Sequence, residues 1–467
     1  MSINPGIFKG YDIRAIYPTD INEKNIVAII RAIYTFLIKD YKGNIPFTLV
    51  VGTDMRISSP SLTKAAIKTL LSLGANIIDI GLVSTPTFYF VVSHYNYDAG
   101  IQITASHNPK EWNGIKIVKN SPKGLIKIGK PTGLETIKEM ALAGESIRTL
   151  AKGKVTQKTE FLKDEVKNAL RIADNPTIKK FKIVADAANA MGSQYILALF
   201  NRINAHLIKM NFDLDGTFPA HQPDPLQSET LVELQKRVIK EKADLGLAPD
   251  GDGDRLFFID EKGNVVPPTI ITSIIAKDLL KKYKREKILI DIRYILTPQR
   301  IVKENGGAIQ ITRVGHAYIT EAMNKTGGIF AGESSGHYFF RETGNAESQL
   351  PIILTVLKVL TEENKPFSEL VEDYRRSFES GEYNFKVTNA LEIIDTLKQK
   401  YSDGILDPMD GIAVNYPMWR FSVRISNTEP LLRLNVEADN KTTMEEKRDE
   451  LLNKIKSLSI PLKSLAR

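Results

Sequence analysis

The stretch AGIQITASHNP, residues 99–109, indicates how this chain is built. Ile101 begins a strand-like alternation of apolar and polar residues, and the polar residues 104–108 break it. Asn108 precedes Pro109 and therefore disfavours helix, so we expect an extended or turn conformation there. Ser106 is therefore expected on a loop at the carboxyl end of a strand, where open α/β sheets bind ligands. A serine hydroxyl placed there, beside the imidazole of His107, can accept and donate a phosphoryl or acyl group. The alternative is a Ser/Asn-rich surface turn without chemistry, and this stretch alone leaves both open.

Helices and strands alternate on both sides of this loop. Apolar residues spaced three and four apart predict helices, and short apolar runs between them predict strands. The expected elements before the loop are helices at 26–37, 58–73 and 87–94 and strands at 47–51 and 77–80. After the loop, Trp112-Asn113-Gly114 predicts a turn before a strand at 115–118, and a loop covers residues 119–135. The alternation starts again after residue 152 and once more after residue 260, which predicts repeated βαβ units.

The last part of the chain follows a different pattern. Three strands, at 411–415, 419–425 and 431–438, precede a final helix at 442–456, which is typical of an α+β arrangement. We therefore expect an α/β protein of three similar α/β domains, with mixed, mostly parallel sheets, and a C-terminal α+β domain. The expected boundaries are 1–152, 153–258, 259–372 and 373–467.

Composition excludes several classes of protein. The absence of cysteine excludes disulfides, thiolate metal sites and cysteine nucleophiles. No apolar run reaches the ~18 residues of a membrane helix, and the amino terminus lacks a secretory signal, so we expect a cytoplasmic protein without a membrane partner. The net charge of +8 favours anionic partners. Its densest run, residues 281–287, closes an amphipathic helix without interleaved aromatics, so we expect small phosphorylated metabolites rather than nucleic acid.

The sequence PDGDGDR, residues 249–255, predicts a metal site. Asp250, Asp252 and Asp254 alternate with glycines, so their carboxylates project to one side and offer the hard oxygens that suit Mg²⁺. An EF-hand loop is one alternative, since Glu261 stands at its twelfth position, but Arg255 then stands where glycine is needed. A plain acidic turn is the other alternative, although carboxylates this close repel one another without a cation.

Two further loops suit a phosphorylated sugar. In GESSGH, residues 332–337, Glu333 can accept hydrogen bonds from two adjacent sugar hydroxyls, and the glycines allow close approach. In RISNTEPLLR, residues 424–433, two arginines flank a Ser-Asn-Thr turn that can wrap a phosphate. Each loop could instead be a structural turn. Together with the serine and the aspartates, they predict phosphoryl transfer on a sugar phosphate.

These motifs resemble those of the α-D-phosphohexomutase superfamily, the phosphomannomutase/phosphoglucomutase type. TASHNP, DGDGDR, GESSGH and RISNTEPLLR occur in that family's order and spacing, and KGYDIR at residues 9–14 matches its amino-terminal segment. The resemblance implies four domains around a central cleft, with Ser106 carried as phosphoserine. The serine would phosphorylate a hexose 1- or 6-phosphate, giving a hexose 1,6-bisphosphate that serves as intermediate and activator. The bisphosphate would reorient and return its other phosphate.

The resemblance also implies roles for particular residues. Mg²⁺ would lie on Asp250, Asp252, Asp254 and the phosphate of Ser106. The residues expected around the reacting phosphate are Arg14, Ser106, His107, Lys116, Arg255 and His337, with Lys116 and His337 as the candidate proton carriers. The residues expected to bind the sugar phosphate are Tyr11, Arg293, His316, Glu333, Ser335, Arg424, Ser426, Asn427, Thr428 and Arg433.

The sequence departs from the family pattern at a few positions. Ala15 replaces a usual glycine, Arg293 stands about where a phosphate-contacting lysine is expected, and residues 345–347 replace an acidic run, a change we expect at the surface. Asn427 and the WNGIKIV segment at 112–118 favour mannose and glucose phosphates over glucosamine phosphate.

Other functions stay open. A phosphoglucosamine mutase is the alternative within the family, and a metal-dependent serine phosphatase or a non-catalytic sugar-phosphate sensor are alternatives outside it. The phosphatase needs two or more metals, and beyond the aspartate triad the sequence offers no recognisable second His/Asp cluster. A monomer and a homodimer are both compatible with the sequence.

Overall fold

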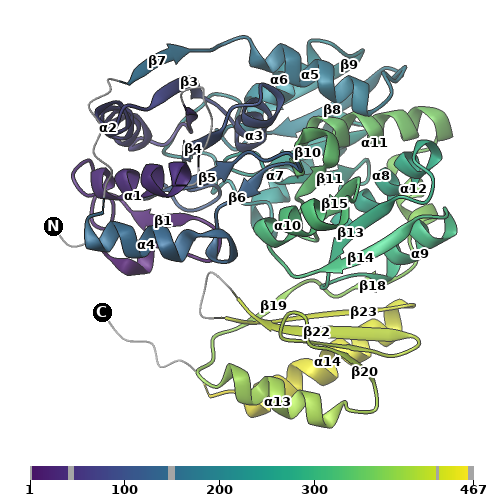
Figure 1. The fold of residues 1–467 in the computed structure, drawn as a ribbon. Coiled ribbons are helices and arrows are strands. Elements are labelled where there is room, and N and C mark those ends of the chain that lie inside the picture. Colours follow the sequence, from purple (N-terminus) through teal and green to yellow (C-terminus); the bar gives the residue numbers. More distant parts are fainter. Residues whose placement is uncertain (1–2, 40, 42–46, 146–152, 427–430, 461–467) are drawn as a thin grey trace.

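The computed structural model describes residues 3–39, 41, 47–145, 153–426 and 431–460 (Figure 1). Four sheets follow one another along this part of the chain. The first three carry helices in α/β units, and the fourth, drawn in yellow-green below them in Figure 1, has its own sheet and helices at the carboxyl end. This architecture confirms the predicted fold class.

The first sheet has the order β1-β5-β4-β2-β3-β7, with β6 paired to β5. Its strands are β1 (Ile13–Ile16), β2 (Thr48–Thr53), β3 (Asn76–Leu82), β4 (Ala99–Ile103), β5 (Trp112–Lys119), β6 (Ile126–Lys127) and β7 (Lys154–Gln157). Its helices are α1 (Ile26–Ile38), α2 (Ser59–Ser72), α3 (Thr85–His94) and α4 (Leu134–Ala143). Strands β4, β2, β3 and β7 are parallel, whereas β5 runs antiparallel to both β4 and β1.

The predicted turn at Trp112-Asn113-Gly114 is wrong, because these residues already belong to β5. The side-chain amide of Asn113 donates to the hydroxyls of Ser58 and Ser59 at 2.7 and 3.0 Å. A Cβ atom on Gly114 would meet the carbonyl oxygen of Ile13 at 2.0 Å, so only glycine lets β1 approach here. The glycine that suggested a turn is therefore explained by the close packing of β5 against β1.

The second and third sheets have the orders β12-β11-β10-β8-β9 and β14-β13-β15-β16-β17. The second unit contains α5 (Phe161–Ile172), β8 (Phe181–Asp186), α6 (Gly192–Phe200), β9 (Ala205–Met210), α7 (Ser228–Glu241), β10 (Leu245–Pro249), β11 (Leu256–Asp260) and β12 (Val265–Val266). The third contains α8 (Pro268–Lys282), β13 (Lys287–Asp291), α9 (Leu296–Glu304), β14 (Ala308–Thr312), α10 (His316–Thr326), β15 (Phe330–Gly332), β16 (Tyr338–Phe340), β17 (Ala346–Glu347), α11 (Leu350–Glu363) and α12 (Phe367–Tyr374).

The fourth sheet is antiparallel, in the order β18-β23-β22-β21-β20, with β19 also paired to β23. Its elements are β18 (Phe378–Glu379), β19 (Tyr383–Phe385), α13 (Ala390–Lys400), β20 (Ile405–Asp407), β21 (Ile412–Asn415), β22 (Trp419–Ile425), β23 (Leu432–Ala438) and α14 (Lys441–Leu458). Both helices pack beneath the sheet in Figure 1. This unit has the α+β arrangement that the sequence predicted.

Two of the predicted domain boundaries separate strands that pair in one sheet. The boundary after residue 152 separates β7 from its parallel partner β3, and the boundary after residue 258 cuts β11, which pairs with β10 along its whole length. Periodicity within a segment does not show which sheet an edge strand joins, so the sequence missed both pairings.

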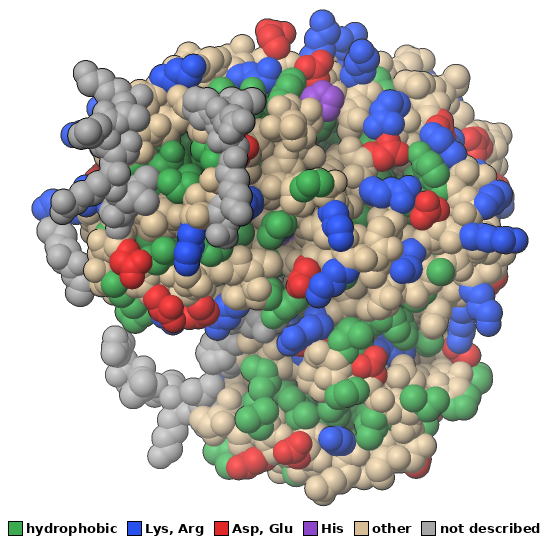
Figure 2. Space-filling model, in the orientation of Figure 1, with side chains coloured by type: hydrophobic (Ala, Val, Ile, Leu, Met, Phe, Trp, Pro, Cys, Tyr) green, Lys and Arg blue, Asp and Glu red, His purple; other side chains and the backbone are tan. Residues whose placement is uncertain are grey.

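The buried apolar side chains form one large core through the second and third units and separate cores in the first and fourth. None of the helices in the described ranges is long and apolar enough to cross a membrane. On the face shown in Figure 2, Lys and Arg side chains are scattered among acidic and uncharged ones.

Candidate active site

Ser106 lies three residues beyond β4, on the loop that the sequence predicted. Its backbone is in the left-handed region, with φ of +51°, a conformation that a serine rarely adopts without outside support. That support comes from Arg56, a fully buried side chain whose Nη2 donates to the carbonyls of Ser106 and Asn108, both at 2.6 Å. Arg14 also donates to this loop, through Nη1 to the side-chain oxygen of Asn108 at 2.7 Å. The loop that carries Ser106 is thus fixed by two cations from elsewhere in the first unit.

The serine faces the aspartate loop of the second unit. Its Oγ donates to Oδ2 of Asp250 at 3.0 Å and lies 3.2 Å from Nδ1 of His107. The two loops touch closely, since a Cβ atom on Gly251 would meet the carbonyl oxygen of Ser106 at 2.3 Å. Glycine at this position therefore brings the hydroxyl to the carboxylates.

Asp250, Asp252 and Asp254 form the predicted carboxylate triad. All three are buried, and one ligand oxygen from each lies within 4.8 Å of the others. Burial and the charges of the other two carboxylates raise the pKa of Asp250 well above its usual range. One oxygen of Asp252, Oδ1, is buried without a hydrogen-bond partner in the described part of the chain. Three hard oxygens that repel one another, one of them unsatisfied, fit a magnesium ion.

The EF-hand alternative does not fit. Residues 256–260, which would belong to the middle of such a loop, form β11. The carboxylate of Glu261 turns away and accepts hydrogen bonds from the backbone N–H and hydroxyl of Ser368, at 2.9 and 2.5 Å. The candidate metal ligands of this loop are therefore Asp250, Asp252 and Asp254, without Glu261.

Lys116 enters the triad from β5. Its Nζ lies 2.6 Å from Oδ2 of Asp252 and 2.5 Å from Oδ2 of Asp254. Although burial disfavours the charged form, these carboxylates raise the pKa of Lys116 well above its usual range. The ammonium group therefore supplies a positive charge between two of the carboxylates.

His337 connects the triad to the sugar loop. Its Nε2 lies 3.2 Å from Oδ1 of Asp254, and its Nδ1 lies 2.8 Å from Oε2 of Glu333 and 3.0 Å from Oγ of Ser335. Burial opposes the charge, but these carboxylates raise the pKa of His337 to about 9. Arg255 lies beside it, with Nε 3.4 Å from the same ring. The predicted triad, proton carriers and sugar loop are thus one continuous network.

The other sugar-phosphate candidates surround the sugar loop. The backbone N–H of Gly315 donates to Oε1 of Glu333 at 2.9 Å, and Arg293 lies 3.4 Å from the same oxygen and 3.3 Å from Oγ of Ser335. The rings of Tyr11 and His316 lie 5.3 Å apart. Tyr11, from the first unit, and His316, from the third, therefore meet where the sequence analysis expected a shared site.

The phosphate-binding motif is partly described. Arg424 is the last residue but one of β22, Ser426 follows the strand, and Arg433 lies on β23 directly opposite Arg424. Asn427 and Thr428 lie outside the described residues. The three arginines Arg293, Arg424 and Arg433, called the arginine cluster below, gather around the carboxylate of Glu382, a residue that the sequence analysis did not single out.

Residues 345–347 are buried, so the expectation of a surface change is wrong. The structure also brings Asp254, His337 and Glu347 within 4.8 Å, a group of ligand atoms that the sequence analysis did not foresee. Glu347 carries its own cation, Lys127, which ion-pairs with it and lies over the rings of Tyr89 and Phe339. This second group is therefore already charge-balanced by protein side chains.

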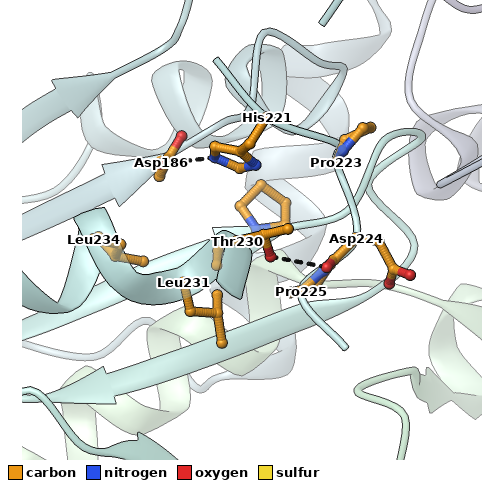
Figure 3. Close-up of a pocket in the computed structure, with 10 residues that line it drawn as sticks. Asp186, His221, Pro223, Asp224, Pro225, Thr230, Leu231 and Leu234 are labelled. Atoms are coloured by element: carbon orange, nitrogen blue, oxygen red, sulfur yellow. Dashed lines mark hydrogen bonds and ion pairs between the residues drawn. The ribbon is translucent and has the colours of Figure 1, made fainter. Parts of the chain in front are cut away.

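A segment of the second unit, residues 221–224, contacts both the aspartate loop and the serine loop. In the pocket of Figure 3, His221 lies 3.1 Å from Asp186, and Pro223 and Asp224 follow on the same segment. The carbonyl of Pro223 accepts from the backbone N–H of Gly251 at 3.0 Å, and Asp224 lies 3.3 Å from Arg255. The neighbouring Gln222 donates to the carbonyl of His107 at 3.1 Å.

Family models, related sequences and a solved structure all match this chain along nearly its whole length. Models of the four phosphoglucomutase/phosphomannomutase domains match residues 5–141, 160–263, 267–377 and 360–454. A phosphomannomutase of Methanocaldococcus jannaschii is 36% identical over 98% of this chain and 99% of its own length. One from Vibrio cholerae is 35% identical over 97% and 99%. A solved phosphoglucomutase/phosphomannomutase family protein of Burkholderia thailandensis superimposes with a TM-score of 0.86 at 27% identity, covering 97% of this chain and 98% of that one.

Proposed function

Since the chain belongs to the phosphoglucomutase/phosphomannomutase family and is a phosphohexomutase, we propose that it interconverts the 1- and 6-phosphates of mannose and glucose through a phosphorylated Ser106 and a hexose 1,6-bisphosphate. The observation that carries this proposal is the 3.0 Å hydrogen bond from Ser106 Oγ to Asp250. It joins a serine held in an unusual conformation to a buried carboxylate triad. Such a pair suits a phosphoserine that shares a cation with the carboxylates.

In this proposal Asp250, Asp252, Asp254 and the phosphoserine hold Mg²⁺. The ion, when bound, neutralises negative charge on the phosphoryl group in transfer. Lys116 lies between Asp252 and Asp254, so its ammonium group and the metal compete for the same oxygens. We infer that Lys116 shifts from these carboxylates toward the reacting phosphate when the metal is bound.

The transfer itself exchanges one P–O bond for another. A free hydroxyl of the hexose phosphate attacks the phosphorus of phospho-Ser106, its O–P bond forms, and the bond from phosphorus to Ser106 Oγ breaks. The sugar hydroxyl loses a proton and Ser106 Oγ gains one, with Lys116 and His337 as the candidate carriers. Because neighbouring carboxylates keep both side chains protonated, each first donates its proton and accepts one only afterwards. Arg14, which contacts the serine loop, and Arg255, which lies beside His337, stabilise charge on the phosphoryl oxygens.

Recognition of the sugar phosphate is assigned to the third and fourth units, together with Tyr11 of the first. Glu333 and Ser335 accept and donate hydrogen bonds to ring hydroxyls, and Tyr11 and His316 close the site from both sides. The non-reacting phosphate lies on the arginine cluster with Ser426, Asn427 and Thr428. The relatives named phosphomannomutase support mannose phosphate as a substrate, and no finding favours a glucosamine phosphate.

Phosphorus NMR of purified protein tests this function. With Mg²⁺ and a trace of glucose 1,6-bisphosphate, mannose 1-phosphate should convert to mannose 6-phosphate without release of inorganic phosphate. Ser106→Ala should lose this conversion while still binding the sugar phosphate. Phosphate release at the rate of isomer formation would instead identify a serine phosphatase. Binding without any turnover would identify a sensor.

A further inference from the structure

The arginine cluster has a carboxylate of its own. Oε1 of Glu382 lies 3.0 Å from Nη1 of Arg433, and Oε2 lies 3.3 Å from Nη2 of Arg424 and 3.9 Å from Nη1 of Arg293. The two oxygens therefore face three guanidinium groups from two units of the protein. This is the arrangement in which guanidinium groups usually bind a phosphate.

Backbone geometry holds Glu382 in this position. Strands β18 and β19 both pair with β23, and Ser380, Gly381 and Glu382 bulge between them. The backbone N–H of Ser380 donates to the carbonyl of Val436 at 2.9 Å, and the backbone N–H of Val436 donates to the Ser380 hydroxyl at 3.0 Å. A bulge redirects a side chain from the regular strand pattern. Here it directs the carboxylate of Glu382 toward the arginines.

The arginines need an anion. Arg424 and Arg433 stand directly opposite each other on β22 and β23, where like charges destabilise a sheet. The Arg424 side chain is only 3% exposed and that of Arg293 7%. Burial and the charge of Arg293 lower the pKa of Arg424. With the sugar phosphate absent, Glu382 supplies a compensating charge to Arg424 and Arg433, whereas Arg293 is paired mainly with Asp291 and Glu333.

The cluster retains hydrogen-bonding capacity for a ligand. Nε of Arg424 is buried and has no hydrogen-bond partner in the described part of the chain. Arg293 is held in place by Asp291, which lies 2.9 Å from its Nε. The carboxylate of Glu382 is 23% exposed, so it can turn toward solvent more easily than the arginines can.

Building on the phosphate-binding role assigned above to these arginines, we propose that Glu382 is an internal competitor of the substrate. Its carboxylate occupies the arginine cluster until the non-reacting phosphate of the hexose phosphate displaces it. Each binding event then exchanges one anion for another, which weakens phosphate binding. Fast release suits a mutase whose bisphosphate has to leave this cluster, turn round and bind again by its other phosphate.

The effect of Glu382→Gln on phosphate affinity distinguishes a competing carboxylate from one that only holds the arginines in place. If Glu382 competes with phosphate, Glu382→Gln tightens phosphate binding. If Glu382 only aligns the arginines, the same variant disorders them and weakens binding. Glu392→Gln is the matched control, because it removes an equal charge from an exposed position on α13 of the same unit.

Calorimetric titration with inorganic phosphate, without sugar or metal, is the direct test. Removing a competing carboxylate at this distance should tighten phosphate binding about tenfold in Glu382→Gln, with no change in Glu392→Gln. In turnover assays KM for mannose 1-phosphate should fall and kcat should fall with it, because release becomes slower. Unchanged or weaker phosphate binding by Glu382→Gln would overturn the proposal.

A second variant keeps the proposal testable if Glu382→Gln does not fold. Glu382→Asp keeps the charge but withdraws it by one methylene, so it should tighten phosphate binding by a smaller factor. Both titrations are independent of turnover. A wild-type protein that does not interconvert hexose phosphates would refute the proposed function and leave the phosphate comparison intact.

Discussion

At the scale of single residues, the nucleophile depends on a buried arginine far from it in sequence. Besides the carbonyls of Ser106 and Asn108, Arg56 donates to those of Pro109 and Trp112, at 2.7 and 3.0 Å. Its charge is balanced by Asp54, whose Oδ2 lies 3.2 Å from Nε. One guanidinium group therefore fixes the whole turn that presents the serine hydroxyl.

Substitution of this arginine should affect both folding and catalysis. Arg56→Ala leaves buried carbonyls without a donor and the charge of Asp54 without its cation, so the free energy of unfolding should fall by about 3–5 kcal/mol. Arg56→Lys keeps the charge but lacks the planar fork, so it should lower kcat while KM stays near the wild-type value. Urea denaturation and steady-state kinetics measure both quantities, with Arg171→Ala on the surface as control. A wild-type kcat in Arg56→Lys would mean that the loop carrying Ser106 keeps its conformation without the guanidinium group.

The carboxylate triad gives a second prediction at this scale. Asp252→Asn removes one anionic ligand and the charge that faces Lys116. The Mg²⁺ concentration at half-maximal activity should rise more than about tenfold, since a neutral amide is a weaker ligand for this ion. Magnesium titration of turnover measures the shift. An unchanged titration curve would remove Asp252 from the metal site.

At the scale of elements, a buried carboxylate joins α5 to α3. Glu165 is 3% exposed and accepts a hydrogen bond from the hydroxyl of Thr87 at 2.8 Å. Burial raises the pKa of Glu165 to about 7, from the ordinary value of 4.5. The unfolded chain therefore loses this proton at a lower pH than the folded protein. Because burial disfavours the charged carboxylate, the folded protein becomes less stable relative to the unfolded chain as pH rises from 4.5 to 7.

Glu165→Gln should accordingly stabilise the protein in a pH-dependent way. The gain in unfolding free energy should be absent below about pH 4.5 and grow to at most about 3 kcal/mol above pH 7. Denaturant unfolding across this pH range measures it, with Glu160→Gln, at an exposed position before α5, as control. A gain that is equal at all pH values would show that Glu165 ionises normally.

Local sequence predicted most elements and many of the residues that the structure brings together at the candidate site, for reasons visible in particular residues. Ser106, the three aspartates and Glu333 each lie in a short motif whose chemistry is evident without the fold. Arg56, Lys127 and Glu382 were missed because they reach the site through tertiary contacts, from segments with no motif of their own. Trp112-Asn113-Gly114 was misassigned because its glycine serves the approach of β1, a contact remote in sequence.

At the scale of the whole molecule, a buried ion pair docks the fourth unit on the third. Arg420 on β22 lies 2.9 Å from Glu437 on β23 and donates to the carbonyls of Arg293 and Ile292 at 2.9 and 2.8 Å. Glu437 accepts from the backbone N–H of Ile295 at 2.6 Å. The segment thus held carries Arg293, so docking of the fourth unit positions part of the arginine cluster.

Disrupting this contact should weaken substrate binding at a distance. Arg420→Ala leaves Glu437 buried and unpaired, which should cost about 3–5 kcal/mol of unfolding free energy. KM for the hexose phosphate should rise, because Arg293 and Arg424 no longer hold their relative positions. Chemical denaturation and kinetics measure the two effects, with Lys441→Ala, which removes an exposed cation at the start of α14, as control. Lower stability with an unchanged KM would separate docking from phosphate binding.

The most direct test of the central claim is the intact mass of the protein after incubation with glucose 1,6-bisphosphate and Mg²⁺, followed by mapping of the modified peptide. We predict one phosphate, on Ser106, that persists in buffer and disappears when a hexose monophosphate is added. Ser106→Ala should stay unmodified. A protein that carries no phosphate, or carries it on another residue, or loses it to water within seconds, would contradict the assignment of a phosphoserine mutase.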